Sequence, residues 1–289
     1  MGQGKRAIGP MEIAGIAIVA ILVAVAVFHR MNAGPEGNAA DAAYPAPSGY
    51  SGLPAKRTGT PAPSAANAGP FAGTPAGNYA KGEAGLVMPA AKAVPGFTVA
   101  EVRAGLADVR AAMIAGRLDQ RMLVQHEPSV FLGLVAPSSR SHLEPAFKDG
   151  GQMTLATYID PAVKLDPAEQ PRVNGTVTFT SVQSGGVPTL QVKTNFLWVY
   201  AFIGGYPRIA AVHDEITWQL PSAKNLAAAD KGLWIRESSG YTAWMDCEAS
   251  KKGLLRPGVS TDPEQTGATE DPEAALDSAH SLDVGSSCN

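Results

Sequence analysis

The spacing of apolar residues changes near the middle of the chain. Over residues 97–147 they recur every three or four positions, which predicts helices, and Thr98 with Glu101 forms a capping box where the first helix begins. Over residues 172–245 apolar and polar side chains alternate, which predicts about four antiparallel strands. The strand over residues 190–203 becomes apolar on both faces toward its end, so we expect that end to be covered on both sides.

Helices followed by antiparallel strands predict an α+β fold, in which the N-terminal helices pack on one face of a curved sheet. We expect this globular domain over residues 97–256, a length that suffices for one hydrophobic core. Residues 31–96 are rich in Ala, Gly, Pro and Ser and are predicted to form a disordered linker. Residues 257–289 carry acidic side chains without Lys or Arg and are predicted to form a disordered tail.

One apolar stretch near the N-terminus bears on the location of the protein. Ile13–Phe28 contains no charged or hydrogen-bonding side chain and approaches the length of a membrane-spanning helix. Lys5 and Arg6 precede it, and the positive-inside rule then places residues 1–10 in the cytoplasm and the bulk of the chain outside the cell membrane. We therefore expect residues 11–30 to form a single-pass transmembrane helix, with a cleaved signal peptide as the alternative.

Composition and motifs narrow the classes of function. A net charge of −3 and a pI near 6.0 argue against a nucleic-acid-binding protein, which would show a basic face. The chain contains no Walker loop, dinucleotide fingerprint, HExxH motif or GxSxG motif, and its histidines are dispersed. We therefore expect neither a cofactor nor a metal site.

The chain has 2 cysteines, Cys247 and Cys288, and both fall on the predicted outer side of the membrane, where a disulfide persists. A bridge between them is one interpretation, and it would stabilise the fold by roughly 4 kcal/mol. The other is a buried Cys247 with an unpaired Cys288 in a loose tail, because spacing alone does not establish pairing.

Most charged residues of the domain are expected to lie in solvent. Arginines of the helical half are interleaved with acidic residues, which is typical of a solvated helix face. His213 and Glu215 lie on the polar face of a half-buried strand, and we expect both to be solvated. The arginines are Arg103, Arg110, Arg117 and Arg121.

The order of elements from Phe97 to Leu254 resembles the nuclear-transport-factor-two-like (cystatin-like) fold, a cone made by a long helix and a curved antiparallel sheet. The segments TNFLWVYAF and VHDEITWQLP resemble those of uncharacterised membrane-anchored proteins of actinobacteria. This resemblance implies an extracytoplasmic domain on a membrane anchor. The fold class includes enzymes with acid–base groups inside the cone and scaffold domains of secretion machines, so it does not choose between catalysis and assembly.

Asp214 is the one chemically anomalous residue. By strict alternation it shares the apolar face of Val212 and Ile216, where burial would raise the pKa of its carboxyl and suit it to act as a general base. The alternative is structural. A bulge would turn Asp214 into solvent, or an arginine such as Arg208 or Arg236 would pair with it.

Two functions remain open at this point. The first is a non-catalytic binding or assembly module, tethered to the membrane, which contacts a protein partner or a second copy of itself. Strand edges or the faces of Trp and Tyr side chains would make its contacts. The candidate binding residues are Trp198, Tyr200 and Trp218, which could also line a pocket beside Asp214. The second is a small-molecule-binding protein or acid–base enzyme that uses the cone interior, with Asp214 as its candidate catalytic residue.

Overall fold

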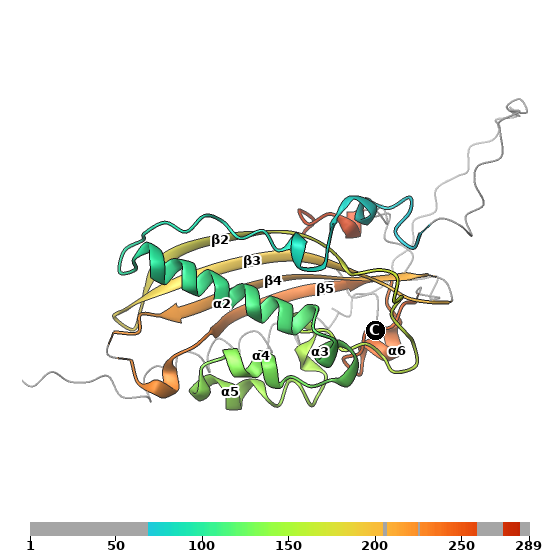
Figure 1. Ribbon diagram of the computed structural model, residues 1–289. Helices are drawn as coiled ribbons and strands as arrows, with labels where there is room; N and C mark the ends of the chain where they lie inside the picture. The colour runs from blue at the N-terminus through green and yellow to red at the C-terminus, as the bar shows by residue number, and fades with distance from the viewer. Residues whose placement is uncertain (1–68, 205–206, 225, 259–273, 284–289) are drawn as a thin grey trace, which may run out of the picture.

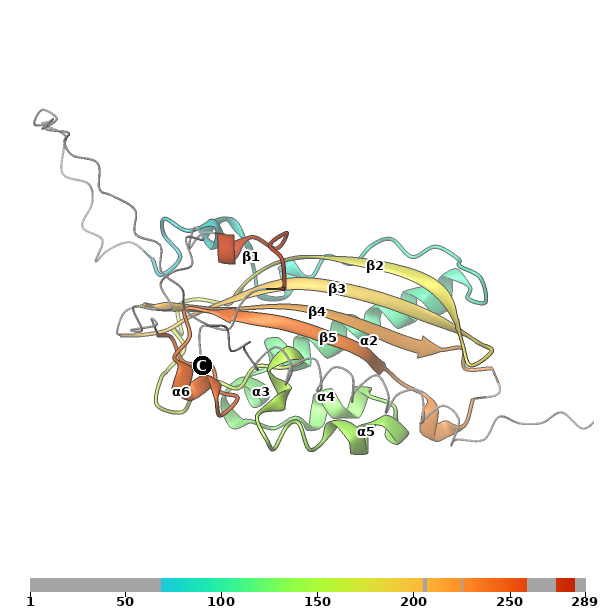
Figure 2. The same ribbon diagram turned by 180° about the vertical axis from the view of Figure 1, so that it is seen from behind.

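The computed structural model describes residues 69–204, 207–224, 226–258 and 274–283. They form an α+β fold, as predicted, with a five-stranded antiparallel sheet in the order β1-β2-β3-β4-β5. Helix α2 (Val99–Arg117) runs across one face of this sheet, seen from the front in Figure 1 and from behind in Figure 2. We call the face under α2 the inner face and the opposite one the outer face.

The register of the strands fixes which side chains share a face. The strands are β1 (Ala80–Lys81), β2 (Arg172–Ser184), β3 (Val187–Ala201), β4 (Ile209–Pro221) and β5 (Trp234–Ala243). β3 and β4 pair without interruption and place Phe196 opposite Asp214. The β4–β5 pairing shifts only between Thr217 and Trp218, beyond Asp214. The alternation expected for β4 therefore holds at Asp214.

Helix α2 begins where the capping box predicts. The Thr98 side chain accepts a hydrogen bond from the Glu101 N–H, and the Glu101 carboxylate accepts one from the Thr98 N–H at 2.7 Å, so the capping box is confirmed. Gly105 lets α2 approach β3 closely, since a Cβ there would lie 2.8 Å from Leu190. The other helices are α3 (Gln120–Gln125), α4 (Ser129–Leu134), α5 (Pro137–Leu143) and α6 (Cys247–Ser250). Short 3₁₀ turns are η2 (Pro75–Asn78), η3 (Gly82–Gly85), η4 (Gly151–Thr154), η5 (Ala228–Asp230) and η7 (Ala274–Leu276).

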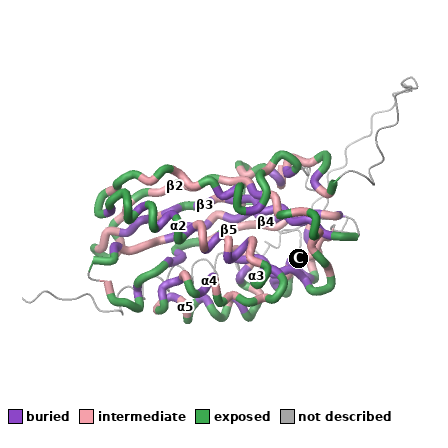
Figure 3. Tube along the Cα trace, in the orientation of Figure 1, coloured by how far each residue is buried: buried purple, intermediate pink, exposed green. Residues whose placement is uncertain are grey.

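Buried apolar side chains form two clusters, one on each face of the sheet. Figure 3 marks the buried residues along the chain in purple. The larger cluster lies between the sheet and the helices and includes Val109 of α2 and Phe131 of α4. The smaller, which we call the outer cluster, consists of Phe71, Ala76, Leu197, Val199, Ala201, Ile209, Ala211 and Leu276. The prediction that the end of the long strand is covered on both sides is confirmed.

The expectation of disorder is wrong for residues 69–96 and 274–283. Phe71 and Leu276 are buried in the outer cluster, and Leu86 is buried in the larger one. Each of these segments contributes isolated apolar anchors rather than a periodic face, so the hydrophobic pattern does not reveal them. The folded domain therefore includes residues 69–96 in addition to the range expected from sequence.

The predicted membrane anchor at residues 11–30 lies outside the described residues, together with residues 31–68 of the predicted linker. In the part of the chain that the structure describes, no helix has both the length and the hydropathy needed to cross a bilayer. The anchor therefore stays a prediction.

Candidate functional site

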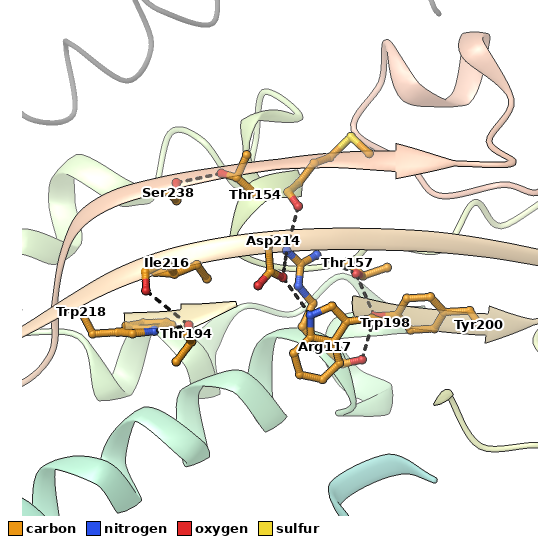
Figure 4. Close-up of polar contacts among 11 residues, drawn as sticks. Arg117, Thr154, Thr157, Thr194, Trp198, Tyr200, Asp214, Ile216, Trp218 and Ser238 are labelled. Carbon is orange, nitrogen blue, oxygen red and sulfur yellow. Dashed lines mark hydrogen bonds and ion pairs between the residues drawn. The ribbon is translucent and has the colours of Figure 1, made fainter. Parts of the chain in front are cut away.

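Asp214 lies in the middle of β4 and points from the inner face toward the end of α2 (Figure 4). Its carboxylate is paired with Arg117, with 2.8 Å between Arg117 Nη2 and Asp214 Oδ2 and both side chains 2% exposed. The indole N–H of Trp198 donates to the same carboxylate oxygen at 2.9 Å. The alternation of the sequence predicted the correct face for Asp214, and an ion pair was one of the alternatives.

The arginine that pairs with Asp214 is not one of those expected. Arg208 contacts Asp166 at 3.3 Å, and Arg236 is exposed. Arg117 is the last residue of α2, so the end of the helix carries its guanidinium over the sheet. The expectation of a solvated helix face is therefore wrong for Arg117, although Arg103 is exposed as predicted.

The guanidinium of Arg117 is held from several sides. Its Nη1 donates to Thr157 Oγ1 and its Nη2 to the Met153 carbonyl oxygen, both at 2.9 Å. The Tyr200 hydroxyl lies 3.0 Å from Thr157 Oγ1 and donates to the Arg117 carbonyl oxygen at 3.0 Å. We call Arg117, Asp214, Trp198, Thr157 and Tyr200 the buried polar cluster. It ties the end of α2 to β3, to β4 and to the loop before β2.

The interpretation of Trp198, Tyr200 and Trp218 as a binding surface is wrong, because all three side chains are 0% exposed. The Trp218 indole N–H donates to Thr194 Oγ1 at 3.0 Å, inside the same core. Burial raises the pKa of Tyr200 to about 12, so its hydroxyl stays protonated and remains a hydrogen-bond donor.

The buried polar cluster is closed to a substrate. Burial raises the pKa of Asp214 to about 6, although the Arg117 charge and the Trp198 N–H act in the opposite direction. The small hollow beside Arg117, lined by Met153, Thr157 and other residues, has no room for a water molecule. A general base must come within hydrogen-bond reach of the proton it removes, and this carboxylate is enclosed by the protein's own donors.

The outer face offers a different kind of surface. Away from the outer cluster, β2 to β5 present polar side chains in rows across the sheet. One row is Thr176, Asn195, Glu215 and Ser239, and the next is Thr178, Lys193, Thr217 and Glu237. Lys193 and Glu215 form an ion pair at 2.7 Å, and most of these residues are exposed or half-buried. We call these two rows the polar outer face.

The other half of the outer face is covered by residues 69–79 and by residues 274–283, and we call residues 274–283 the strap. Leu276 is its buried anchor, 1% exposed within the outer cluster. The Tyr79 hydroxyl donates to the Leu276 carbonyl oxygen, and the Tyr241 hydroxyl donates to that of Ala275 at 3.2 Å. Asn174 Nδ2 also donates to Ser278 Oγ at 3.2 Å. The strap is thus bound through two backbone carbonyl oxygens, the buried Leu276 side chain and the Ser278 hydroxyl.

His213 lies beside the strap, and the expectation that it is solvated is wrong. The residue is 0% exposed, and its Nε2 lies 2.8 Å from Asn195 Oδ1. Tyr241 packs edge-on against His213 and also against His280 of the strap, with ring centroids 5.1 Å and 5.8 Å apart. Burial, together with the His280 charge, lowers the pKa of His213 to about 4.

The remaining candidate residues concern disulfides and metals. Cys247, the first residue of α6, is disulfide-bonded, and Cys288 lies outside the described residues, so their pairing stays a prediction. Among the residues that the structure describes, no group of three His, Cys, Asp or Glu side chains is arranged to hold a metal ion.

Comparison with known proteins adds no relative. No protein-family model matches the chain, and no curated protein or solved structure is significantly similar to it. Function must therefore be argued from the geometry of the two faces of the sheet.

Proposed function

We propose that this chain is a non-catalytic binding or assembly module, displayed outside the cell membrane on an anchor formed by residues 11–30. The observation that carries the proposal is the open polar outer face, where four strands present side chains that none of the described helices covers. The face with a helical layer, by contrast, encloses Asp214 completely.

The chemistry of the polar outer face favours a protein partner or a second copy of the chain. Hydroxyl and amide side chains predominate, and its charges include the paired Lys193 and Glu215 as well as the exposed Glu237. Such a mixture of charges does not create the positive electrostatic potential that attracts a nucleic acid. It offers many hydrogen-bond donors and acceptors to a polar protein surface.

The location rests on the sequence of the N-terminal region. An uncharged apolar run follows Lys5 and Arg6, and the segment between it and residue 69 is rich in Ala, Gly, Pro and Ser. A chain of this composition is suited to present a domain away from a membrane. The helix-before-sheet order supports the resemblance to the nuclear-transport-factor-two-like fold, whose membrane-anchored members include scaffolds.

Site-specific photo-crosslinking in intact cells tests this function. A photo-reactive residue is placed at Thr178 on the polar outer face or, as the matched control, at Arg103 on the exposed side of α2; both positions are exposed. We expect a discrete crosslinked species from Thr178 and none from Arg103. Equal labelling at both positions, or none from Thr178, overturns the proposal.

A further inference from the structure

The strap is bound to the outer face in the way that a separate peptide would be. We propose that the part of the outer face beneath the strap, here called the groove, also accepts residues 274–283 of a second copy, so that two copies assemble by exchanging straps. This inference names the partner for the assembly function proposed above and adds a second contact beside the polar outer face, and it rests on that proposal.

The groove has the features of a peptide-binding site. Its floor is the apolar outer cluster, which receives Leu276, and its walls supply the hydroxyl groups of Tyr79 and Tyr241. These hydroxyls donate to the carbonyl oxygens of two successive residues, Ala275 and Leu276. The buried side chain fixes the register of the bound segment, and the hydrogen bonds contact its backbone, as is common in peptide recognition.

Once the disulfide of Cys247 is reduced, the strap can leave without opening the main core. Leu276 is its only residue that is fully buried, and the strap lies against the outer cluster, whereas the larger cluster is on the other side of the sheet. Segments with few buried apolar contacts open locally at a lower free energy than global unfolding. Departure of the strap would uncover apolar residues such as Leu197 and Ala211, which would favour a replacement ligand.

The strap of a second copy is a ligand for the groove that the chain itself provides. Gly258 and Ala274 are separated by roughly 15 residues, which span at most about 50 Å when extended, enough to reach the groove of a neighbour. Exchange of an identical terminal segment reproduces every contact of the closed form, so a dimer needs no new interface. Anchoring of both copies in one membrane would raise their effective concentration further.

Complementation between two full-length variants in detergent tests strap exchange. One carries Leu276→Asp, which disables its strap, and the other carries Tyr79→Phe with Tyr241→Phe, which weakens its groove. Both also carry Cys247→Ser, which removes the disulfide of Cys247. We expect each variant alone to be monomeric by light scattering and the mixture to form a 1:1 dimer. A monomeric mixture of folded variants overturns the exchange.

A labelled synthetic peptide of residues 274–283 provides the second measurement. We expect it to bind the Leu276→Asp chain saturably, and the same peptide with the Leu276→Asp change to bind roughly tenfold more weakly or worse, because it loses its buried anchor. Absence of peptide binding to the folded chain also overturns the inference. If crosslinks from Thr178 persist in that case, the assembly function stands and only the strap contact is refuted.

Discussion

Arg117 at the end of α2 and Asp214 in the middle of β4 form an ion pair with 2.8 Å between Nη2 and Oδ2, and neither side chain is more than 2% exposed. The pair joins the helical layer to the sheet. Trp198, Thr157 and the Met153 carbonyl oxygen occupy further hydrogen-bonding positions around it. Its surroundings are those of a structural connection rather than of a catalytic carboxylate.

Removal of one charge from this pair should destabilise the protein strongly. Arg117→Met leaves the Asp214 carboxylate buried without a counter-charge, and we expect a loss of about 3–5 kcal/mol in the free energy of unfolding, measured in urea at about pH 8, where the wild-type carboxylate is ionised. The matched control is Arg208→Gln, which breaks the more exposed pair with Asp166 and should cost less than about 1 kcal/mol. Equal losses would show that the buried pair is not a structural connection.

Replacement of both charges should be milder than removal of one. Arg117→Met combined with Asp214→Leu removes the buried ions together and substitutes apolar groups of comparable size. We expect the double variant to recover a large part of the stability that Arg117→Met loses, because no uncompensated charge remains. Urea denaturation of the wild type and of both variants measures this. A double variant less stable than Arg117→Met contradicts the explanation.

Two buried groups on opposite faces should give opposing pH dependences. The pKa of His213 is about 4, below its ordinary 6.5, so its contribution to stability is complete above pH 6.5 and is lost as the pH falls toward 4. The pKa of Asp214 is about 6, above its ordinary 3.8, so its contribution is complete below pH 3.8 and is lost as the pH rises through 6. In the wild type the two trends offset each other.

The His213→Gln variant should therefore expose the trend of Asp214. We expect its free energy of unfolding, relative to that of the wild type at each pH, to decrease as the pH rises from about 4 to about 6.5. Urea unfolding at several pH values across this range gives the comparison. Parallel profiles for the two proteins would show that His213 does not change its protonation in this range.

Attachment of the strap to the outer face should depend on its buried anchor, Leu276. Leu276→Ala is expected to accelerate amide hydrogen exchange in residues 274–283 while it changes the urea midpoint of the whole domain little, because the strap opens locally. The control is Leu282→Ala, at a strap position that is only partly buried. If Leu276→Ala destabilises the entire domain instead, the strap is an integral part of the core and does not open independently.

The local pattern of apolar and polar residues predicted helices, strands and the faces of the strands well. Alternation along β4 placed Asp214 on the inner face, and the Thr98–Glu101 capping box marked the start of α2. The same reasoning could not find Arg117, because its position relative to Asp214 depends on how the end of α2 crosses the sheet. Nor could it tell a cavity from a packed core, since Trp198 and Trp218 suit either environment.

Hydrophobic periodicity could not predict which segments cover the outer face. His213 lies on the face of β4 that was expected to be polar, yet Tyr241 packs edge-on against it and His280 packs against Tyr241, both from distant parts of the chain. Phe71 and Leu276 stand alone among small and polar residues. Their burial depends on the two-sided apolar end of β3, which the sequence did predict, but nothing local identified which segments would cover it.

Photo-crosslinking from Thr178 in a full-length chain that also carries Arg117→Met and Asp214→Leu tests the central claim most directly. The claim is that the protein acts through its outer face and that the buried pair only holds the fold together. We predict that the folded double variant gives the same crosslinked species as the wild type, in similar yield. Loss of that species from a protein that remains folded would contradict the claim.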